Sequence, residues 1–296
     1  MIPDSLRQLL DATQGQRRSH WQGREVWLAN EAWGELALSL QGAQVLHFRP
    51  ASNKEGNGWL WVTPTPQAMP GAIRGGIPLC WPWFADDRYA DETEDHSGPF
   101  HGTARKAEWR LDAVDEHEGG VELHLSPETR LHGQLSPRLM VQANANRLHV
   151  ELITEHTGET PVKLSGALHS YLAVGDAQAC RVEGLAGARY LDKLRDFAEA
   201  NQQGELGVRG AVDRIYHSNA ELTLDDGRRR LRIARQGSDS AVVWHPGEAL
   251  PEDIAAEAAR HFLCVESANT RLDPVWLVPG AQHLLGTTLS LAEDTP

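Results

Sequence analysis

The stretch Gly119-Gly120-Val121-Glu122-Leu123-His124-Leu125-Ser126 decides the fold class of this chain. After a Gly-Gly turn signal, apolar and polar residues alternate strictly, which is the pattern of a β-strand with one buried face. The same alternation recurs at residues 35–40, 148–152 and 230–233, and a second turn signal, Asp225-Asp226-Gly227, precedes the last of these runs. Many such strands separated by turns predict an all-β protein in which antiparallel sheets pack as a sandwich.

Few helices accompany these strands. Residues 5–12 form one candidate, and Pro251–Arg260 form a second, because a proline near the start and acids in the first turn are typical of a helix N-terminus. No βαβ rhythm, GxGxxG or GxxxxGK[ST] occurs, which argues against a nucleotide-binding fold. Since the sequence also lacks repeats, low-complexity tracts and linker-like stretches, we expect one domain over residues 1–296.

The charge and the chain start limit the classes of partner. A net charge of −13 repels nucleic acid and anionic membranes, so neither is expected as a partner. No run of about 18 apolar residues occurs, and Met1–Arg7 lacks the basic start and apolar stretch of a signal peptide. The cysteines Cys80, Cys180 and Cys264 form no CxxC motif and are expected to be buried thiols in a reducing compartment. We therefore expect a cytoplasmic protein, and a monomer.

The longest stretch without alternation covers residues 74–105. Long loops in compact domains are usually functional or disordered. This one is rich in Trp, Pro and Gly, which favours an ordered wall, whereas its acidic part, residues 86–95, is the section expected to move.

Three residues are candidates for acid–base chemistry: His101 in the long loop, and His169 and Glu266 in apolar, strand-like runs. Each could instead be a hydrogen-bonded core residue. Glu266 is the most unusual of the three, because burying a carboxylate is costly unless it has partners or a task.

Arginines and one aspartate form a second set of candidates. The guanidinium groups of Arg74 and Arg105 could bind phosphate with two parallel hydrogen bonds. Arg74 also opens a Gly-Gly turn, whose backbone amides could help to hold an anion. Asp213 could accept hydrogen bonds from sugar hydroxyls, or it could simply stabilise a turn. Arg228–Arg230 and Arg232 are expected to form a solvated basic face.

Seven motifs in order resemble those of the glucose-6-phosphate 1-epimerases, which belong to the aldose 1-epimerase superfamily. Each motif is weak alone, but together they spread from about Val26 to Leu291. They are Arg74-Gly75-Gly76-Ile77-Pro78, Trp81-Pro82-Trp83-Phe84, His101-Gly102-Thr103-Ala104-Arg105, Leu168-His169-Ser170-Tyr171-Leu172, Asp213-Arg214-Ile215-Tyr216, Cys264-Val265-Glu266 and Leu277-Val278-Pro279-Gly280.

The resemblance implies a galactose-mutarotase-like fold, a large antiparallel β-sandwich (supersandwich) with few short helices and a sugar cleft on one concave face. It implies that His169 is the general acid and Glu266 the general base. It also implies substrate-binding roles for His101, Asp213, Arg74 and Arg105, the two arginines forming a phosphate clamp. One departure is visible: the chain has Trp244-His245-Pro246-Gly247 where related sequences often have Trp-Asn-Pro-Trp, which leaves fine specificity open.

The implied reaction is the interconversion of the α and β anomers of a hexose 6-phosphate, with glucose 6-phosphate the first choice. Glu266 would take the proton of the C1 hydroxyl while a protonated His169 gives one to the ring oxygen. Histidine has a suitable pKa by default, and a nearby Glu266 carboxylate would favour the imidazolium. This chemistry requires no cofactor or metal, and no metal-ligand spacing such as HExxH occurs.

Three other functions remain open at this stage. The chain could be an aldose 1-epimerase for unphosphorylated hexoses, although the two arginines argue against it. It could be a non-catalytic carbohydrate-binding module on the same sandwich. A glycoside hydrolase or lyase is the least supported, because hydrolases usually need two carboxylates around one bond and the sequence offers one well-placed candidate.

Overall fold

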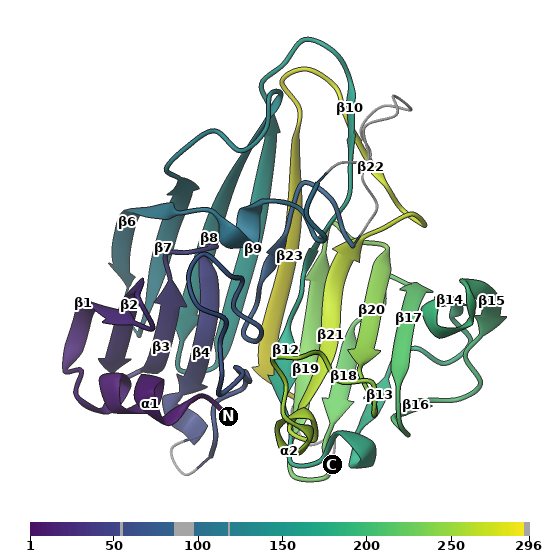
Figure 1. The fold of residues 1–296 in the computed structure, drawn as a ribbon, viewed down its shortest axis with the longest axis horizontal. Helices are drawn as coiled ribbons and strands as arrows, with labels where there is room; N and C mark the ends of the chain where they lie inside the picture. Colours follow the sequence, from purple (N-terminus) through teal and green to yellow (C-terminus); the bar gives the residue numbers. More distant parts are fainter. Residues whose placement is uncertain (54–55, 86–97, 118, 293–296) are drawn as a thin grey trace.

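The computed structural model describes residues 1–53, 56–85, 98–117 and 119–292. The acidic segment 86–95 lies outside the described residues, so its expected movement is untested. Strands make up most of the described chain and helices are few and short, which confirms the all-β prediction (Figure 1).

Two large antiparallel sheets dominate the architecture. In spatial order, the nine-stranded sheet consists of β16 (Leu206–Gly207), β13 (Arg181–Glu183), β18 (Leu222–Asp225), β19 (Arg230–Gln236), β23 (Gln282–Leu291), β9 (Arg147–His156), β8 (Leu135–Asn144), β7 (Gly120–Pro127) and β6 (Trp109–His117). The eight-stranded sheet consists of β15 (Ala198–Asn201), β14 (Arg189–Asp192), β17 (Val212–His217), β20 (Ser240–His245), β21 (Phe262–Asn269), β11 (Gly166–Leu168) and β5 (Leu79–Cys80), with β12 (Tyr171–Ala173) also paired to β21.

Smaller elements complete the fold. A four-stranded sheet contains β1 (Gly15–Trp21), β2 (Arg24–Glu31), β3 (Gly34–Ser39) and β4 (Gln44–Pro50), and a two-stranded sheet pairs β10 (Val162–Leu164) with β22 (Val275–Leu277). The α-helices are α1 (Asp4–Asp11) and α2 (Ala256–Ala259), and the 3₁₀ helices are η1 (Ala51–Asn53), η2 (Ala104–Lys106), η3 (Ala177–Ala179) and η4 (Lys193–Arg195). No helix in the described part of the chain is long and apolar enough to cross a membrane.

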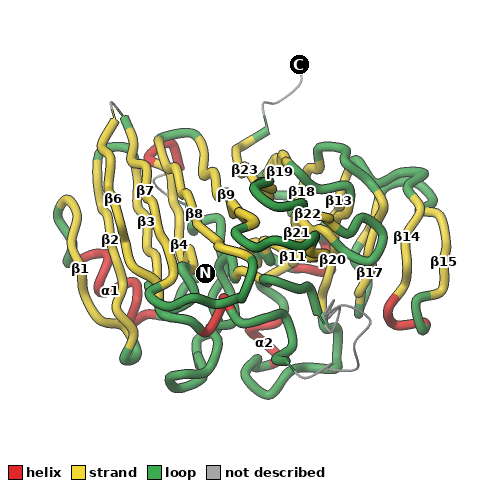
Figure 2. The backbone as a smooth tube through the Cα atoms, turned by 90° about the horizontal axis from the view of Figure 1, so that it is seen from above, coloured by secondary structure: helices red, strands yellow, loops and turns green. Residues whose placement is uncertain are grey.

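The main hydrophobic core joins three of the sheets. It contains Leu38 from β3, Val150 from β9 and Val265 from β21, so one cluster connects the four-, nine- and eight-stranded sheets. Seen from above, the four-stranded and eight-stranded sheets lie beside each other against the same nine-stranded sheet (Figure 2). The expectation of a single domain over residues 1–296 stays a prediction.

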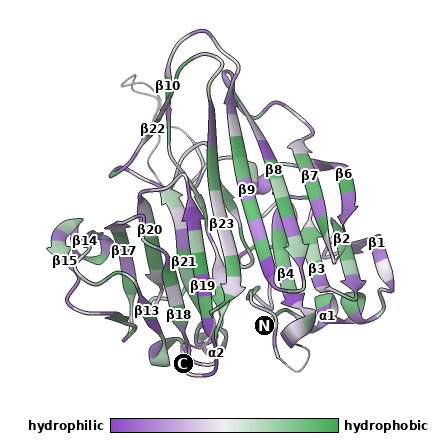
Figure 3. Cartoon of the chain, turned by 180° about the vertical axis from the view of Figure 1, so that it is seen from behind, coloured by the Kyte–Doolittle hydropathy of each residue, from purple (hydrophilic) through white to green (hydrophobic). Residues whose placement is uncertain are grey.

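The predicted strands are all present, but their exposure differs. Strand β7 alternates buried and partly exposed residues, and Figure 3 shows apolar and polar bands alternating along the strands of the nine-stranded sheet. In β3, by contrast, all six residues are buried, so the expectation of one solvated face is wrong there. The reason is helix α1, whose Leu6 and Leu10 pack in one cluster with Ala37 on the second face of β3.

Helix α1 confirms the prediction for residues 5–12, whereas α2 is much shorter than the predicted Pro251–Arg260. The residues before α2 are held by other contacts. The Asp253 carboxylate accepts a hydrogen bond from Arg74 at 2.8 Å, and the Asp253 carbonyl accepts one from the Thr63 hydroxyl at 2.7 Å. These long-range bonds keep this segment out of the helix.

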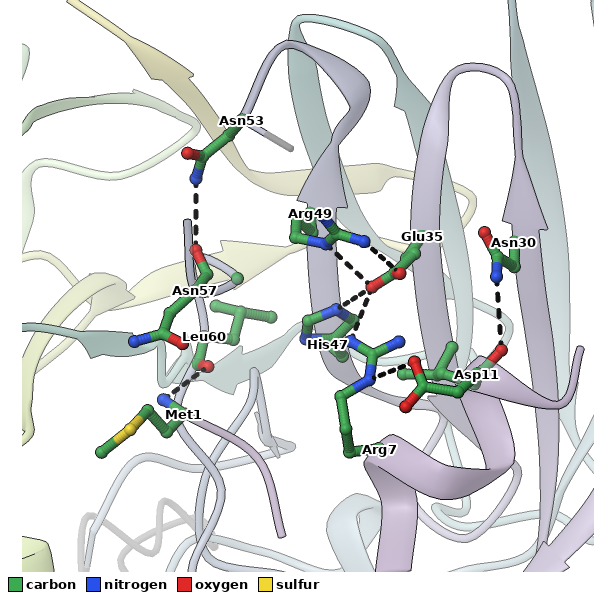
Figure 4. A network of polar contacts seen from close by, with 12 residues as sticks. Met1, Arg7, Asp11, Asn30, Glu35, His47, Arg49, Asn53, Asn57 and Leu60 are labelled. Carbon is green, nitrogen blue, oxygen red and sulfur yellow. Dashed lines mark hydrogen bonds and ion pairs between the residues drawn. The ribbon is translucent and has the colours of Figure 1, made fainter. Parts of the chain in front are cut away.

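A buried carboxylate fastens α1 to the four-stranded sheet (Figure 4). Glu35 on β3 accepts hydrogen bonds from His47 Nε2 at 3.0 Å, Arg49 Nε at 3.0 Å and Arg7 Nη1 at 2.8 Å. Burial acts to raise the pKa of Glu35, but hydrogen bonds from these three partners outweigh it and hold the pKa well below its usual value. Glu35 is therefore an ionised residue whose hydrogen bonds connect α1, β3 and β4.

Candidate active site

The eight-stranded sheet turns one face away from the main core and towards a cavity of about 490 Å³. Registers pair Asp213 with Trp244, and Val242 with Glu266, and directly opposed residues lie on the same face of a sheet. All four line the cavity, whereas the alternate residue Val265 belongs to the main core. The six predicted site residues all line this cavity: Arg74, His101, Arg105, His169, Asp213 and Glu266.

His169 lies in a break between two short strands that pair with the strand of Glu266. Strand β11 pairs Leu168 with Ser267, and strand β12 pairs Tyr171 with Cys264. Continuing this register across the break places His169 opposite Glu266. The two side chains meet with His169 Nε2 and Glu266 Oε1 3.4 Å apart, and the ring of Tyr171 stacks on His169 with centroids 4.8 Å apart.

Burial controls where the protons of this pair lie. Glu266 is 1% exposed, and burial raises its pKa well above the usual value. Burial also lowers the pKa of His169 to about 3, helped by the positive charges of Arg105 and Arg74. The expectation of a near-neutral histidine pKa is therefore wrong for this structure. Burial thus favours the neutral imidazole and the protonated carboxyl over an imidazolium beside a carboxylate, and both arrangements hold the same number of protons.

The pair also has unused hydrogen-bonding capacity. Within the described residues, His169 Nδ1 and Glu266 Oε2 are buried and have no hydrogen-bond partner. Buried polar atoms are usually hydrogen-bonded, and leaving one unpaired costs roughly 1–3 kcal/mol. The catalytic pair therefore has hydrogen-bonding capacity that the enclosed protein does not use.

His101 is a neutral hydrogen-bond donor in this structure. Its Nδ1 accepts a hydrogen bond from the Ala85 amide at 3.0 Å, and its own amide donates to the Ala85 carbonyl at 2.7 Å. Because Nδ1 is an acceptor, the ring proton lies on Nε2. Burial lowers the pKa of His101 well below the usual value, and the positive charge of Arg105 adds to this effect. Its ring centroid lies 5.4 Å from that of His169.

Arg74 is positioned by a close crossing of backbones. At Gly76, where φ is +62°, a Cβ atom would lie 2.1 Å from the Val45 carbonyl oxygen, so only glycine fits. The Gly76 amide donates to the Trp61 carbonyl at 2.7 Å, so the expectation that this amide helps to hold an anion is wrong. Arg74 itself donates from Nε to Asp253 at 2.8 Å and from Nη1 to the Tyr171 hydroxyl at 3.4 Å.

Arg105 reaches the cavity from η2, four residues after His101. Its Nη2 donates to the Phe100 carbonyl at 2.7 Å. Its Nε is buried and has no hydrogen-bond partner among the residues that the structure describes. Part of this guanidinium therefore has unused donor capacity at the cavity wall.

Lys193 was not predicted from the sequence. It lies in η4, directly after β14, and its ammonium is 3.2 Å from Asp213 on the neighbouring strand β17. The same ammonium lies 5.7 Å from the ring centroid of Phe84. Burial raises the pKa of Asp213, and the charge of Lys193 opposes this effect. The Lys193–Asp213 ion pair thus forms a polar wall of the cavity.

The segment that departs from related sequences contributes only its first residue to the described cavity wall. Trp244 lines the cavity. His245 is buried behind it, where its Nε2 contacts the Ala259 carbonyl at 3.0 Å and its Nδ1 accepts from the Gly247 amide at 3.1 Å. In this structure, His245 therefore supports the loop after β20.

Within the described chain, the group of side chains that could jointly hold a metal ion lies elsewhere, on β6 and β7. It consists of Asp115, Glu122 and His124. It belongs to the nine-stranded sheet and is separate from the residues that line the cavity.

Comparisons with known proteins place this arrangement in a family. The aldose 1-epimerase family matches residues 24–290. A protein of Escherichia coli (strain K12), provisionally named a glucose-6-phosphate 1-epimerase, is 32% identical over 246 residues, which are 79% of each chain. A protein of Cenchrus ciliaris with the same provisional name is 28% identical over 239 residues, covering 72% of this chain and 68% of that protein.

Solved structures agree on the fold. The crystal structure of a provisionally named mutarotase from Salmonella typhimurium superposes with a TM-score of 0.83 and 25% identity, covering 96% of this chain and 95% of that one. The galactose-mutarotase-like sandwich and the family resemblance predicted from the sequence are thereby confirmed. With a family match over nearly its whole length, this chain belongs to the aldose 1-epimerase family.

Proposed function

We propose that this protein interconverts the α and β anomers of a hexose 6-phosphate, with glucose 6-phosphate the preferred substrate. The observation that carries this proposal is the charge of the cavity. Two of its cations are compensated, since Arg74 pairs with Asp253 and Lys193 pairs with Asp213. The His169–Glu266 pair is neutral overall in either proton arrangement. Two further cations of the described lining remain without an acidic partner in the cavity, Arg105 and Lys106.

This surplus of about two positive charges matches the substrate. A phosphate monoester carries about 1.5 to 2 negative charges at neutral pH. A free hexose carries no charge and would leave this positive surplus uncompensated. The surplus is local to the cavity, because the whole chain has a net charge of −13. The provisional name of the Escherichia coli relative points to the same substrate. Together these facts favour the phosphorylated sugar over the alternative of unphosphorylated hexoses.

The proposed chemistry follows from the short distance within the catalytic pair. In a pyranose, the C1 hydroxyl and the ring oxygen are bonded to the same carbon. An acid and a base 3.4 Å apart can therefore serve both oxygens. Glu266 takes the hydroxyl proton, His169 gives a proton to the ring oxygen, and the ring opens. Rotation about the C1–C2 bond presents the other carbonyl face, and the two groups exchange roles on closure.

The remaining residues bind and orient the sugar in this proposal. The Nε2–H group of His101 donates a hydrogen bond that stabilises charge at the ring oxygen. Asp213 accepts hydrogen bonds from sugar hydroxyls. Arg74 and Arg105 hold the phosphate and so place C1 between the catalytic groups. No cofactor is required for these steps.

The proposal also bears on location and assembly. A hexose phosphate is an anion that does not cross a membrane unaided, so the activity implies a cytoplasmic protein. We also propose that the enzyme is a monomer.

Anomer exchange at equilibrium, measured by NMR with glucose 6-phosphate, glucose and galactose, tests the proposal. We expect the phosphorylated sugar to exchange fastest. Arg105→Ala should raise KM for glucose 6-phosphate roughly 10- to 100-fold, the range of a charge-assisted hydrogen bond, and leave KM for glucose unchanged. The control is Arg110→Ala, which removes an arginine that is exposed on β6. Equal exchange on free sugars, or an equal loss on both substrates, would contradict the phosphate assignment.

A second prediction concerns Lys193. Lys193→Met should raise KM for glucose and for glucose 6-phosphate alike, by about tenfold (about 1.4 kcal/mol), because it leaves the partly buried Asp213 without its ion pair. Lys106→Met removes the same charge from the exposed rim of the cavity and should affect the phosphorylated sugar alone. A Lys193 effect confined to the phosphorylated sugar would show that Lys193 binds phosphate instead.

A further inference from the structure

We infer that the phosphate group of the substrate activates the catalytic pair as well as anchoring the sugar: by bringing negative charge beside Arg74 and Arg105, it moves the shared proton from Glu266 to His169. This inference rests on the proposed function. If it is correct, the phosphate raises kcat, whereas a phosphate that only anchored the sugar would change the binding affinity alone.

Short chains of contacts connect both arginines to His169. Arg74 Nη1 donates to the Tyr171 hydroxyl at 3.4 Å, and the Tyr171 ring stacks on His169 at an interplanar angle of 10°. Arg105 Nη2 donates to the Phe100 carbonyl, and the Phe100 ring packs edge-on against His101 with centroids 4.2 Å apart. His101 in turn packs edge-on against His169.

These contacts pass through buried side chains, so water screens the charges weakly. Tyr171 is 4% exposed and His169 is 8% exposed. In such surroundings a charge acts over several ångströms with more effect than in water. Arg74 and Arg105 are therefore well placed to oppose a positive charge on His169.

The arginines oppose a positive charge on the imidazole. Burial is the main cause that lowers the pKa of His169, and the charges of Arg105 and Arg74 add to it. Arg74 contacts Tyr171, whose ring stacks on His169, so negative charge beside Arg74 favours the imidazolium. Among the described residues, the ionisable groups around the pair and its cavity are Arg74, Cys80, His101, Arg105, Lys106, Tyr171, Lys193, Asp213, Asp253 and Cys264.

The resulting step is a proton transfer within the pair. The O–H bond of the Glu266 carboxyl breaks and an N–H bond forms on His169, so no proton is exchanged with solvent. The 3.4 Å separation of the two groups allows this transfer directly or through a sugar hydroxyl. The product is a carboxylate that can take the C1 proton and an imidazolium that can give one. When a hexose without phosphate binds, the proton stays on the Glu266 carboxyl and the His169 imidazole stays neutral.

The test supplies the sugar and the anion as two separate molecules, glucose and inorganic phosphite. Anomer exchange of glucose is measured with increasing inorganic phosphite, with enzyme-free samples subtracted at each concentration. We expect phosphite to raise kcat for glucose about tenfold or more, with saturation, in the wild type and in the exposed control Arg110→Ala. Arg105→Ala should lose this activation. Phosphite that only competes with glucose 6-phosphate and leaves glucose exchange unchanged would overturn the inference, and so would phosphite that does not compete at all.

A second readout requires no turnover. NMR of the histidine rings, with His169 assigned from a His169→Gln variant, should show that phosphite raises the titration midpoint of His169 by about one pH unit or more. An unchanged midpoint with phosphite bound would overturn the inference. The two proposals fail differently: a wild type that does not exchange glucose 6-phosphate refutes the proposed function, whereas fast exchange without any phosphite effect refutes only the activation.

Discussion

Replacing Glu266 by glutamine is expected to lower kcat for anomer exchange by about 10³-fold or more. The amide has the shape of the carboxyl group but can neither take nor give the proton, and a positioned acid or base contributes roughly 10²–10⁴-fold. KM should change little, because the amide keeps the size and hydrogen-bonding geometry of the side chain. NMR exchange spectroscopy of glucose 6-phosphate with the wild type and the variant measures both quantities.

The same substitution should stabilise the protein. Burial raises the pKa of Glu266 above its unfolded value, so the wild type loses stability as the pH rises from that value, about 4.3, towards the folded pKa. Glutamine does not titrate and escapes this loss, so Tm near pH 8 should rise. Glu257→Gln, at a side chain that is 78% exposed, is the control for both measurements. A kcat within about threefold of the wild type would rule out Glu266 as the base.

Glu35→Gln should destabilise the fold by about 2–3 kcal/mol without changing kcat. Breaking a buried ion pair typically costs about 3–5 kcal/mol. We expect less here because Arg7 and Arg49 are 30% and 24% exposed and can turn towards water. Urea unfolding of the two proteins near pH 7 measures the difference. Glu25→Gln, which removes an exposed ion pair with Arg18, should cost less than about 0.5 kcal/mol.

The pH dependence of this difference identifies its cause. The folded pKa of Glu35 lies well below the unfolded value of about 4.3. The stabilisation is therefore complete above the unfolded pKa and is lost as the pH falls towards the folded pKa. The gap between wild type and Glu35→Gln should shrink below about pH 4. A gap of equal size at pH 3 and pH 7 would mean that packing, and not the ionised carboxylate, is responsible.

The strand pattern and the site could be predicted because both are local in the sequence. Alternation at residues 121–126 fixes which side chains of β7 are buried. Glu266 was recognisable because a carboxylate is costly to bury in an apolar strand unless it has a function. In the structure it lies on the face of β21 that lines the cavity. The family motifs then brought His169 and Arg105 into the same prediction.

The features that the sequence did not predict depend on contacts between residues far apart in the chain and on how deeply a side chain is buried. Lys193 reaches Asp213 only because β14 pairs with β17, and nothing around Lys193 indicates that pairing. Asp253 resembles a helix N-terminus in the sequence, yet its carboxylate binds Arg74, 179 residues away. The pKa of His169 follows from how deeply the ring is enclosed, which no local pattern records.

The two faces of strands β20 and β21 offer a practical route to new specificity. Val243, Leu263 and Val265 pack in the main core, whereas Val242 and Trp244 line the cavity. A mutant library restricted to Val242 and Trp244 would explore new substrates while the core residues and Glu266 stay unchanged. Tolerance to substitution and choice of sugar could then be evolved almost independently, one residue apart along the same strand.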